Sequence, residues 1–182
     1  MRLAPVALAS AVLLALVGCV PSDPHGSPSP HASATPVFAS DAEALAAAEK
    51  AYAAYLKVSD EIANDGGQNP QRFATVVTPS WLPNEIASAS QLASSGRRQD
   101  GATTFSQLKL QQVGADEADV SLVAYTCLNL MGTKILDSGG NDVTPSTRVS
   151  MFSVEVSFRS AKDSPSHLLV DSNEPWSGPS FC

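Results

Sequence analysis

The stretch RVSMFSVEVSFRS, residues 148–160, decides the fold class. Hydrophobic and polar residues alternate along it, which is typical of a β-strand with one face on a core. One face carries Phe152, Val154, Val156 and Phe158, and the other carries Met151, Ser153, Glu155 and Ser157. The preceding stretch ADVSLVAYTCLNL, residues 118–130, is hydrophobic at both parities, which predicts a strand covered on both faces.

Two further strands are expected beside these. TTFSQLKLQQVG, residues 103–114, changes parity between Phe105 and Leu108, which indicates a β-bulge, and SHLLVDS, residues 166–172, predicts a short last strand. The segment 131–147 contains Gly-Gly and Asn-Asp pairs that suit a hairpin tip. Asp137, Asn141 and Asp142 there could form a calcium loop, but the motif spacing of such loops is missing, which favours ordinary turn chemistry.

A long helix is expected to begin after Ser40. Ser40 and Glu43 form a capping box, and Gly66 with Gly67 suits the helix end. Between them, residues with helical spacing form one stripe that should face the core: Leu45, Ala48, Tyr52, Tyr55, Leu56, Ser59 and Ile62.

Two shorter helices should follow, because Asn69-Pro70 and Thr78-Pro79 are typical helix starts. Pro83 predicts that the second of these helices either bends or begins there. The segment SGRRQDGA, residues 95–102, is expected to be an exposed turn. Helices followed by antiparallel strands give an α+β fold class, with the helices packed on one face of a curved sheet.

Charge excludes one class of partner. The chain has a formal net charge of -7, which becomes about -8 if Arg2 is removed with a signal peptide, so no nucleic-acid partner is expected.

The amino-terminal segment predicts an export signal. A positive Arg2 precedes the uncharged apolar stretch 4–17, which is too short to span a bilayer as a helix. Leu16, Val17, Gly18 and Cys19 resemble the lipobox of bacterial lipoproteins, which implies a signal peptide over 1–18 and acylation of Cys19, with palmitate among the acyl groups. The alternative is an ordinary secretory signal with an incidental cysteine.

The segment 19–39 should be a flexible tether, because it is rich in proline and serine. Its His25 and His31 could bind a metal weakly, although no carboxylate or thiolate joins them at ligand spacing. In an exported protein Cys127 and Cys182 are expected to form a disulfide, which in the chain-entropy model stabilises by about 4 kcal/mol. Two free thiols are the alternative.

The chain also resembles a known group of proteins. Its element order looks like the cone-shaped nuclear-transport-factor-like, or SnoaL-like, fold, over a single domain at 40–182. The whole chain is similar to uncharacterised lipoproteins of high-GC Gram-positive (actinobacterial) origin. The residues that carry the resemblance are LVGC (16–19), AYAAYL (51–56), TPSWL (78–82), VAYTCLNL (123–130), GNDVTP (140–145) and WSGPSFC (176–182).

This resemblance implies a pocket between the long helix and the sheet, which relatives use for isomerase, dehydratase or cyclase activity or for binding alone, and it implies that a homodimer could form through the sheet. The residues expected to line the pocket are Tyr52, Tyr55, Trp81, Tyr125, Phe152, Val154 and Val156. Glu155 is the candidate base, but it points away from the row of Phe152, Val154 and Val156. His167 is the one histidine in this domain.

Each of these side chains is better explained by packing or by solvation than by catalysis, so we expect no catalytic residue, cofactor or metal. The sequence therefore favours a lipid-anchored protein at the extracytoplasmic face of the cell membrane, with a non-catalytic binding or interaction role at the cell envelope. Its partner would be an envelope protein or a small apolar ligand. The alternative is an isomerase or dehydratase of the SnoaL-like type.

Overall fold

The computed structural model describes residues 36–116 and 119–182. The predicted signal peptide, the tether up to residue 35, Cys19, His25 and His31 lie outside the described residues. Within the described ranges, no helix combines the length and the apolar character needed to cross a membrane.

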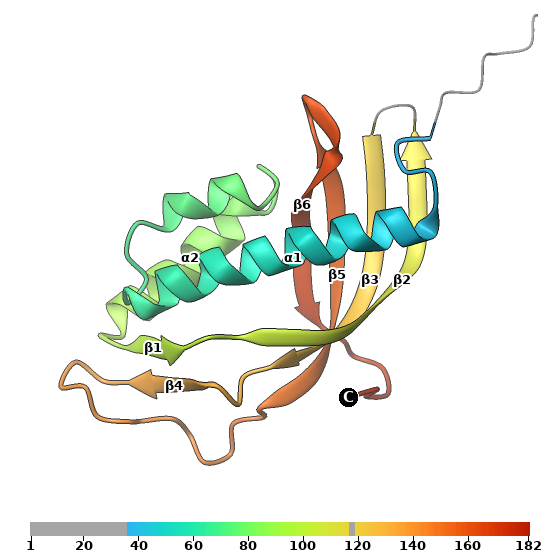
Figure 1. Cartoon of the computed structure of the whole chain (residues 1–182). Helices are drawn as coiled ribbons and strands as arrows, with labels where there is room; N and C mark the ends of the chain where they lie inside the picture. The colour runs from blue at the N-terminus through green and yellow to red at the C-terminus, as the bar shows by residue number, and fades with distance from the viewer. Residues whose placement is uncertain (1–35, 117–118) are drawn as a thin grey trace, which may run out of the picture. The chain divides into compact units, whose positions relative to one another are not determined.

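The structure is α+β, as predicted. In the described residues, three helical segments precede all six strands. Four strands form an antiparallel sheet in the order β2-β3-β5-β6, while β1 and β4 pair separately (Figure 1). The elements are α1 (Asp41–Asn64), η1 (Pro70–Thr75), α2 (Leu82–Ser94), β1 (Arg98–Gly101), β2 (Thr104–Asp116), β3 (Asp119–Asn129), β4 (Thr133–Leu136), β5 (Met151–Ala161) and β6 (Ser164–Pro175).

The capping box of α1 is confirmed. The Ser40 hydroxyl accepts a hydrogen bond from the Glu43 N–H at 3.2 Å, and the Glu43 carboxylate accepts one from the Ala39 N–H at 2.8 Å. At the other end, Gly67 adopts φ +80, and a Cβ at this position would lie 2.1 Å from the Ala89 carbonyl oxygen. Glycine is therefore required both for the backbone conformation and for the close approach of α2.

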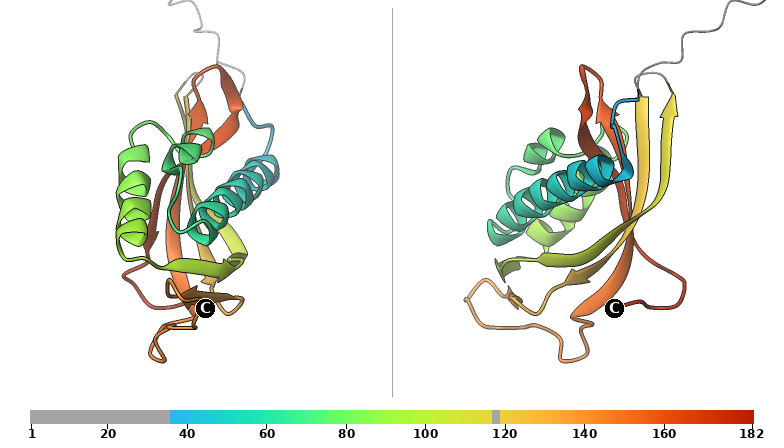
Figure 2. Two further views of the ribbon diagram at one scale, coloured as in Figure 1. Left: turned by 90° about the vertical axis from the view of Figure 1, so that its left-hand side faces the viewer. Right: turned by 45° about the vertical axis from the view of Figure 1, so that its right-hand side comes forward.

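The core lies between the helices and one face of the four-stranded sheet. Figure 2 shows all three helical segments on one side of the sheet and the carboxyl-terminal tail on the other. Tyr52 from α1, Leu122 from β3, Phe158 from β5 and Val170 from β6 are each fully buried. Burial of one such aliphatic or aromatic side chain stabilises a fold by about 1.5–3 kcal/mol, so this layer holds α1 on the sheet.

Both shorter helical segments differ in detail from the prediction. Residues 70–75 form a 3-10 helix, and Asn69 precedes it in the left-handed conformation without a side-chain cap. The next helix begins at Leu82, with Pro83 in its first turn, so Pro83 starts the helix and does not bend it. Thr78 precedes it in a turn, where its carbonyl accepts the N–H groups of Trp81 and Leu82.

The strands require two corrections. The exposed turn predicted over 95–102 is wrong in part, because Arg98–Gly101 pairs with Thr133–Leu136. The last strand is longer than predicted, since β6 continues to Pro175 and pairs with β5 along most of its length. The bulge in β2 is confirmed, with register shifts after Ser106 and Leu110 and a positive φ of 58 at Gln107.

The loop after β4 has the predicted turn chemistry. Asp137 Oδ1 accepts hydrogen bonds from the N–H groups of Gly139 and Asn141, each at 2.9 Å. Hydrogen bonds from the side chain and backbone of Asn141 lower the pKa of Asp137. The carboxylate is thereby committed to holding its own turn closed.

Candidate functional site

Most of the residues expected to line a pocket do lie close together, but they form part of the packed hydrophobic core. Four of them are at most 5% exposed: Tyr52, Tyr55, Val154 and Val156. Trp81 and Phe152 are half-buried and pack against the same core. The ring of Tyr52 makes an edge contact with Phe158, with 6.4 Å between the ring centroids. Large side chains thus fill the space between α1 and the sheet where the expected pocket would lie.

A hydrogen-bonded chain runs through this core from β6 to α2. The Tyr52 hydroxyl donates to Asn173 Oδ1 at 3.1 Å, and Asn173 Nδ2 donates to the Tyr55 hydroxyl at 3.3 Å. The Tyr55 hydroxyl donates to Glu85 Oε1 at 2.9 Å, and Trp81 Nε1 donates to the same oxygen at 2.8 Å. Each polar end of these amphipathic side chains therefore has a partner, as buried polar groups require.

Burial makes ionisation of both phenols even less favourable than it is in water. Desolvation raises the pKa of Tyr52 well above its usual value of 10.0. Desolvation also raises the pKa of Tyr55 well above 10.0, and the nearby Glu85 carboxylate adds to this effect. A hydroxyl that stays protonated acts as a hydrogen-bond donor at neutral pH, which is the role that both tyrosines have here.

Glu85 is the acidic residue that sequence reasoning missed. It is 9% exposed and lies at a small hollow of about 130 Å³ between α1, η1 and α2, with Ser59, Ser88 and apolar side chains around it. The sequence signal that could have identified Glu85 is its position four residues after Trp81, because residues four apart share one helix face and can contact each other. This hollow is smaller than the roughly 300 Å³ at the lower end of typical ligand pockets.

Tyr125 does not join the buried group. It lies on the opposite face of the sheet, paired in register with Glu155, and its ring contacts Trp176 at 4.5 Å and Phe181 at 6.0 Å between centroids. Partial desolvation, and then the Glu155 side chain, raise the pKa of Tyr125. The candidate base Glu155 therefore lies outside the core.

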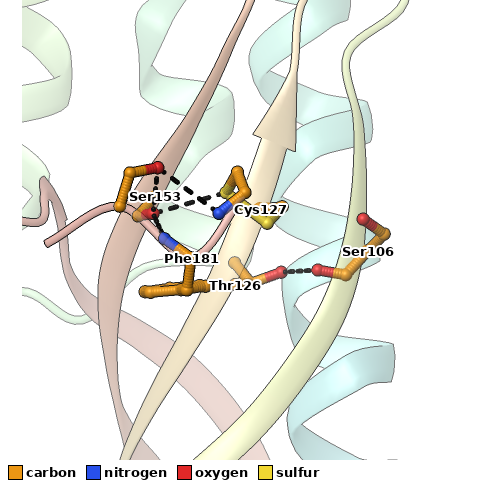
Figure 3. Close-up of a disulfide and its surroundings, with 7 residues drawn as sticks. Ser106, Thr126, Cys127, Ser153 and Phe181 are labelled. Atoms are coloured by element: carbon orange, nitrogen blue, oxygen red, sulfur yellow. Dashed lines mark hydrogen bonds between the residues drawn. A yellow bond between two sulfur atoms is a disulfide. The ribbon is translucent and has the colours of Figure 1, made fainter.

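The carboxyl-terminal tail covers this outer face and is fixed by the predicted disulfide. Cys127 on β3 is bonded to Cys182, with 5.6 Å between the two Cα atoms. The Phe181 N–H donates to the Ser153 hydroxyl at 3.1 Å, next to the disulfide (Figure 3). The homodimer expected through the sheet stays a prediction, and it would have to use the part of this face beside the tail.

An open groove flanks the amino-terminal half of α1. We call it the α1–β6 groove; its volume is about 480 Å³, and it is lined by Phe38, Glu43, Ala46, Ala47, Lys50, Ala51, Ala54, Thr75, Val76, Ser166, His167 and Leu168. Alanines on α1 leave this space open because they carry only a methyl group. The exposed Lys50 and His167 lie at the groove, and their side chains make no hydrogen bond or ion pair with the described residues.

A second groove of similar volume lies between the carboxyl-terminal half of α1 and residues 101–105. Its acidic group Asp60 accepts hydrogen bonds from Gln99 and from the backbone and hydroxyl of Thr103, at 2.6 to 2.8 Å. Glu61 is paired with Lys57 and Arg72. Because these polar groups bind one another, the second groove offers a ligand fewer free contacts than the α1–β6 groove does.

No family model and no curated protein matches the chain. Among solved structures, the intermembrane space region of the chloroplast protein ARC6 is similar, with a TM-score of 0.53, 15% identity, and coverage of 74% of this chain and 97% of that one. Two further structures are more weakly similar. A protein from Catenulispora acidiphila has a TM-score of 0.42 and 14% identity, with coverage of 72% of this chain and 89% of that one. The protein Aln2 from a Streptomyces species has a TM-score of 0.41 and 16% identity, with coverage of 75% of this chain and 90% of that one. The likeness to the ARC6 region shows a shared α+β fold and nothing about activity.

Proposed function

We propose that the chain is a lipid-anchored extracytoplasmic module, fastened through Cys19, that binds an envelope partner or a small apolar ligand in the α1–β6 groove without catalysing a reaction. The observation that carries the proposal is the contrast between a filled interior and an open groove. Tyr52, Val156 and Phe158 are completely buried, whereas the groove of about 480 Å³ is within the size range of ligand sites.

The chemistry of the groove suits a ligand that is mainly apolar and has a polar end. Its floor consists of α1 alanines with Phe38, Val76 and Leu168, and Lys50 and His167 can donate hydrogen bonds from its side. We also propose that the fold is a variant of the cone-shaped nuclear-transport-factor-like fold, because one long helix crosses a curved antiparallel sheet (Figure 1).

Photo-crosslinking in intact cells tests the groove. A benzophenone amino acid in place of Ala54, which is exposed at the groove, is expected to form an adduct with the bound partner or ligand. The same amino acid in place of Ala87, an exposed α2 residue outside the groove, should form none. An Ala46→Trp substitution, which fills the groove, should remove the adduct at position 54. Equal adducts at 54 and 87, or no effect of Ala46→Trp, would contradict the proposal.

Glu85 supports a second candidate, an isomerase or dehydratase. Such enzymes need a carboxylate base in an apolar cavity with a hydroxyl donor opposite, and Glu85 with the Tyr55 hydroxyl at 2.9 Å has this composition. Against it, both donors to Glu85 Oε1 come from the protein itself, and the hollow is small.

Deuterium exchange separates the two candidates. The binding proposal predicts that wild-type protein and Glu85→Gln exchange the α-hydrogens of acetone in D₂O at the same rate, measured by proton NMR. Glutamine keeps an oxygen for Tyr55 and Trp81 but is not a base. A wild-type rate about 100-fold above that of Glu85→Gln would establish base catalysis and reject the non-catalytic function.

A further inference from the structure

A separate hollow at the other end of α1 is lined by two arginines whose side chains have no partner among the described residues. It has a volume of about 570 Å³ and lies between the carboxyl-terminal ends of α1 and α2 and the loop after β4. Arg97 and Arg98 line it, and both are exposed. The hollow is distinct from the α1–β6 groove, since α1 is about 36 Å long at its 24 residues and the two sites lie toward its opposite ends.

Each of the other described arginines has hydrogen-bond partners within the protein. Arg72 donates to Asp65 and to the Gln68 carbonyl, Arg148 donates to Thr133 and the Leu130 carbonyl, and Arg159 donates to Asp119 and Asp171. The side chains of Arg97 and Arg98 form no hydrogen bond or ion pair with any residue of 36–116 or 119–182. Among the arginines of the described ranges, these two consecutive residues are therefore the ones whose guanidinium groups have no partner within the protein.

Both carboxylates at this hollow accept hydrogen bonds from the protein itself. Asp65 Oδ2 accepts a hydrogen bond from Arg72 Nη2 at 2.7 Å, and Asp137 closes its own turn through Gly139 and Asn141. The carbonyls at the end of α1 are also capped, because the Gly66 and Gly67 N–H groups donate to Ala63 and Ile62. The strongest groups left to a ligand are therefore the two guanidinium groups, and Gln68 and Ser138 line the same hollow.

We propose that this hollow binds the phosphate group of an organic phosphate. One guanidinium can satisfy both oxygens of a carboxylate, whereas a phosphate has enough oxygens for two guanidinium groups and further neutral donors. The hollow is also larger than a bare phosphate needs, which leaves room for the organic part. The phosphate could belong to a soluble metabolite or to a lipid headgroup, and both sources offer the same oxygens to Arg97 and Arg98.

Calorimetric titration at physiological ionic strength tests the site, with the full chain carrying Cys19→Ser so that no acyl anchor interferes. The soluble probes are glycerol 3-phosphate and pyrophosphate, and citrate is the carboxylate comparison. Loss of two charged hydrogen-bond donors should weaken phosphate binding by about tenfold or more in Arg97→Gln, Arg98→Gln. The double variant Lys109→Gln, Lys162→Gln removes the same charge at exposed positions elsewhere and should bind as wild type does.

Sedimentation with phosphatidylcholine vesicles, with and without phosphatidylglycerol, identifies the source. Binding that needs phosphatidylglycerol and both arginines assigns the site to a lipid headgroup, and binding of the soluble phosphates alone assigns it to a metabolite. Equal losses in the arginine and lysine variants would overturn the proposal, because only net charge would then matter. Citrate binding as tight as that of the phosphates, or no binding of any probe, would overturn it too.

Discussion

The double variant Cys127→Ser, Cys182→Ser is expected to lose about 4 kcal/mol of unfolding free energy. The disulfide closes a loop with a sequence separation of 55, and in the chain-entropy model the crosslink removes that much conformational freedom from the unfolded chain. The tail should also leave the sheet in this variant, because only weak contacts of Phe181 with Tyr125 and Ser153 remain there once the covalent bond from Cys182 to Cys127 is gone. Denaturant unfolding, followed by tryptophan fluorescence and circular dichroism, measures both effects.

Two comparisons make this result specific to the crosslink. Ser180→Ala changes the tail but keeps the disulfide, so it should unfold within about 0.5 kcal/mol of wild type. Wild-type protein treated with reductant should unfold as the double variant does. In mass spectrometry without reductant, Cys127 and Cys182 should appear in one linked peptide pair. A loss under about 1 kcal/mol, or two freely alkylating thiols, would contradict the structural role of the bond.

The long elements could be predicted from sequence because their patterns are local. The capping box and the helical stripe identify α1, and the alternation of polarity identifies β5. Strand β3, hydrophobic at both parities, was expected to be covered on both faces, and the reason is visible in the structure. Helices cover its Leu122 and Ala124 side, and the tail packs on its Tyr125 and Cys127 side (Figure 2).

The pairing of β1 with β4 could not be predicted in the same way. RQDG has no hydrophobic alternation, and its partner strand is also only four residues long. The pair is an antiparallel backbone pairing between segments about 30 residues apart, and it brings the two backbones so close that a Cβ at Gly101 would lie 2.0 Å from the Gly132 carbonyl oxygen. The polar end of β6 was missed for a similar reason, since Asn173 is held by tyrosines more than 100 residues earlier in the chain.

Two residues of the candidate site, Glu85 and Tyr125, could not be placed correctly from sequence patterns. Packing explains Tyr55 and Trp81 from the sequence, but Glu85, the hydrogen-bond partner that they share, is not identified there, because an acidic residue in the first turn of a helix is ordinarily explained by the helix dipole. The fold resemblance predicts Tyr125 in the same pocket. Its parity, opposite to that of Ala124 and Thr126, puts it on the outer face.

The second large effect is expected from Cys19→Ser, which should move the protein from the membrane fraction to the medium. Each buried methylene contributes about 0.8 kcal/mol, so one acyl chain gives only marginal, reversible binding, whereas two or three chains on one cysteine hold a protein at the membrane. Serine cannot form the thioether, so the variant would lack all of these chains. Ser22→Ala, three residues further on, leaves the lipobox unchanged and should stay in the membrane fraction.

Fractionation with immunoblotting measures the distribution, and metabolic labelling with a clickable fatty acid measures the acylation itself. Wild-type protein and Ser22→Ala should carry the label and Cys19→Ser should not. If Cys19→Ser stayed with the membrane, another contact would have to hold the protein there, and the two free arginines at 97 and 98 would be the first to test. If wild-type protein took up no label, the lipid anchor would be rejected. Binding in the α1–β6 groove would still be open to the crosslinking test, because Cys19 is not among the residues that line the groove.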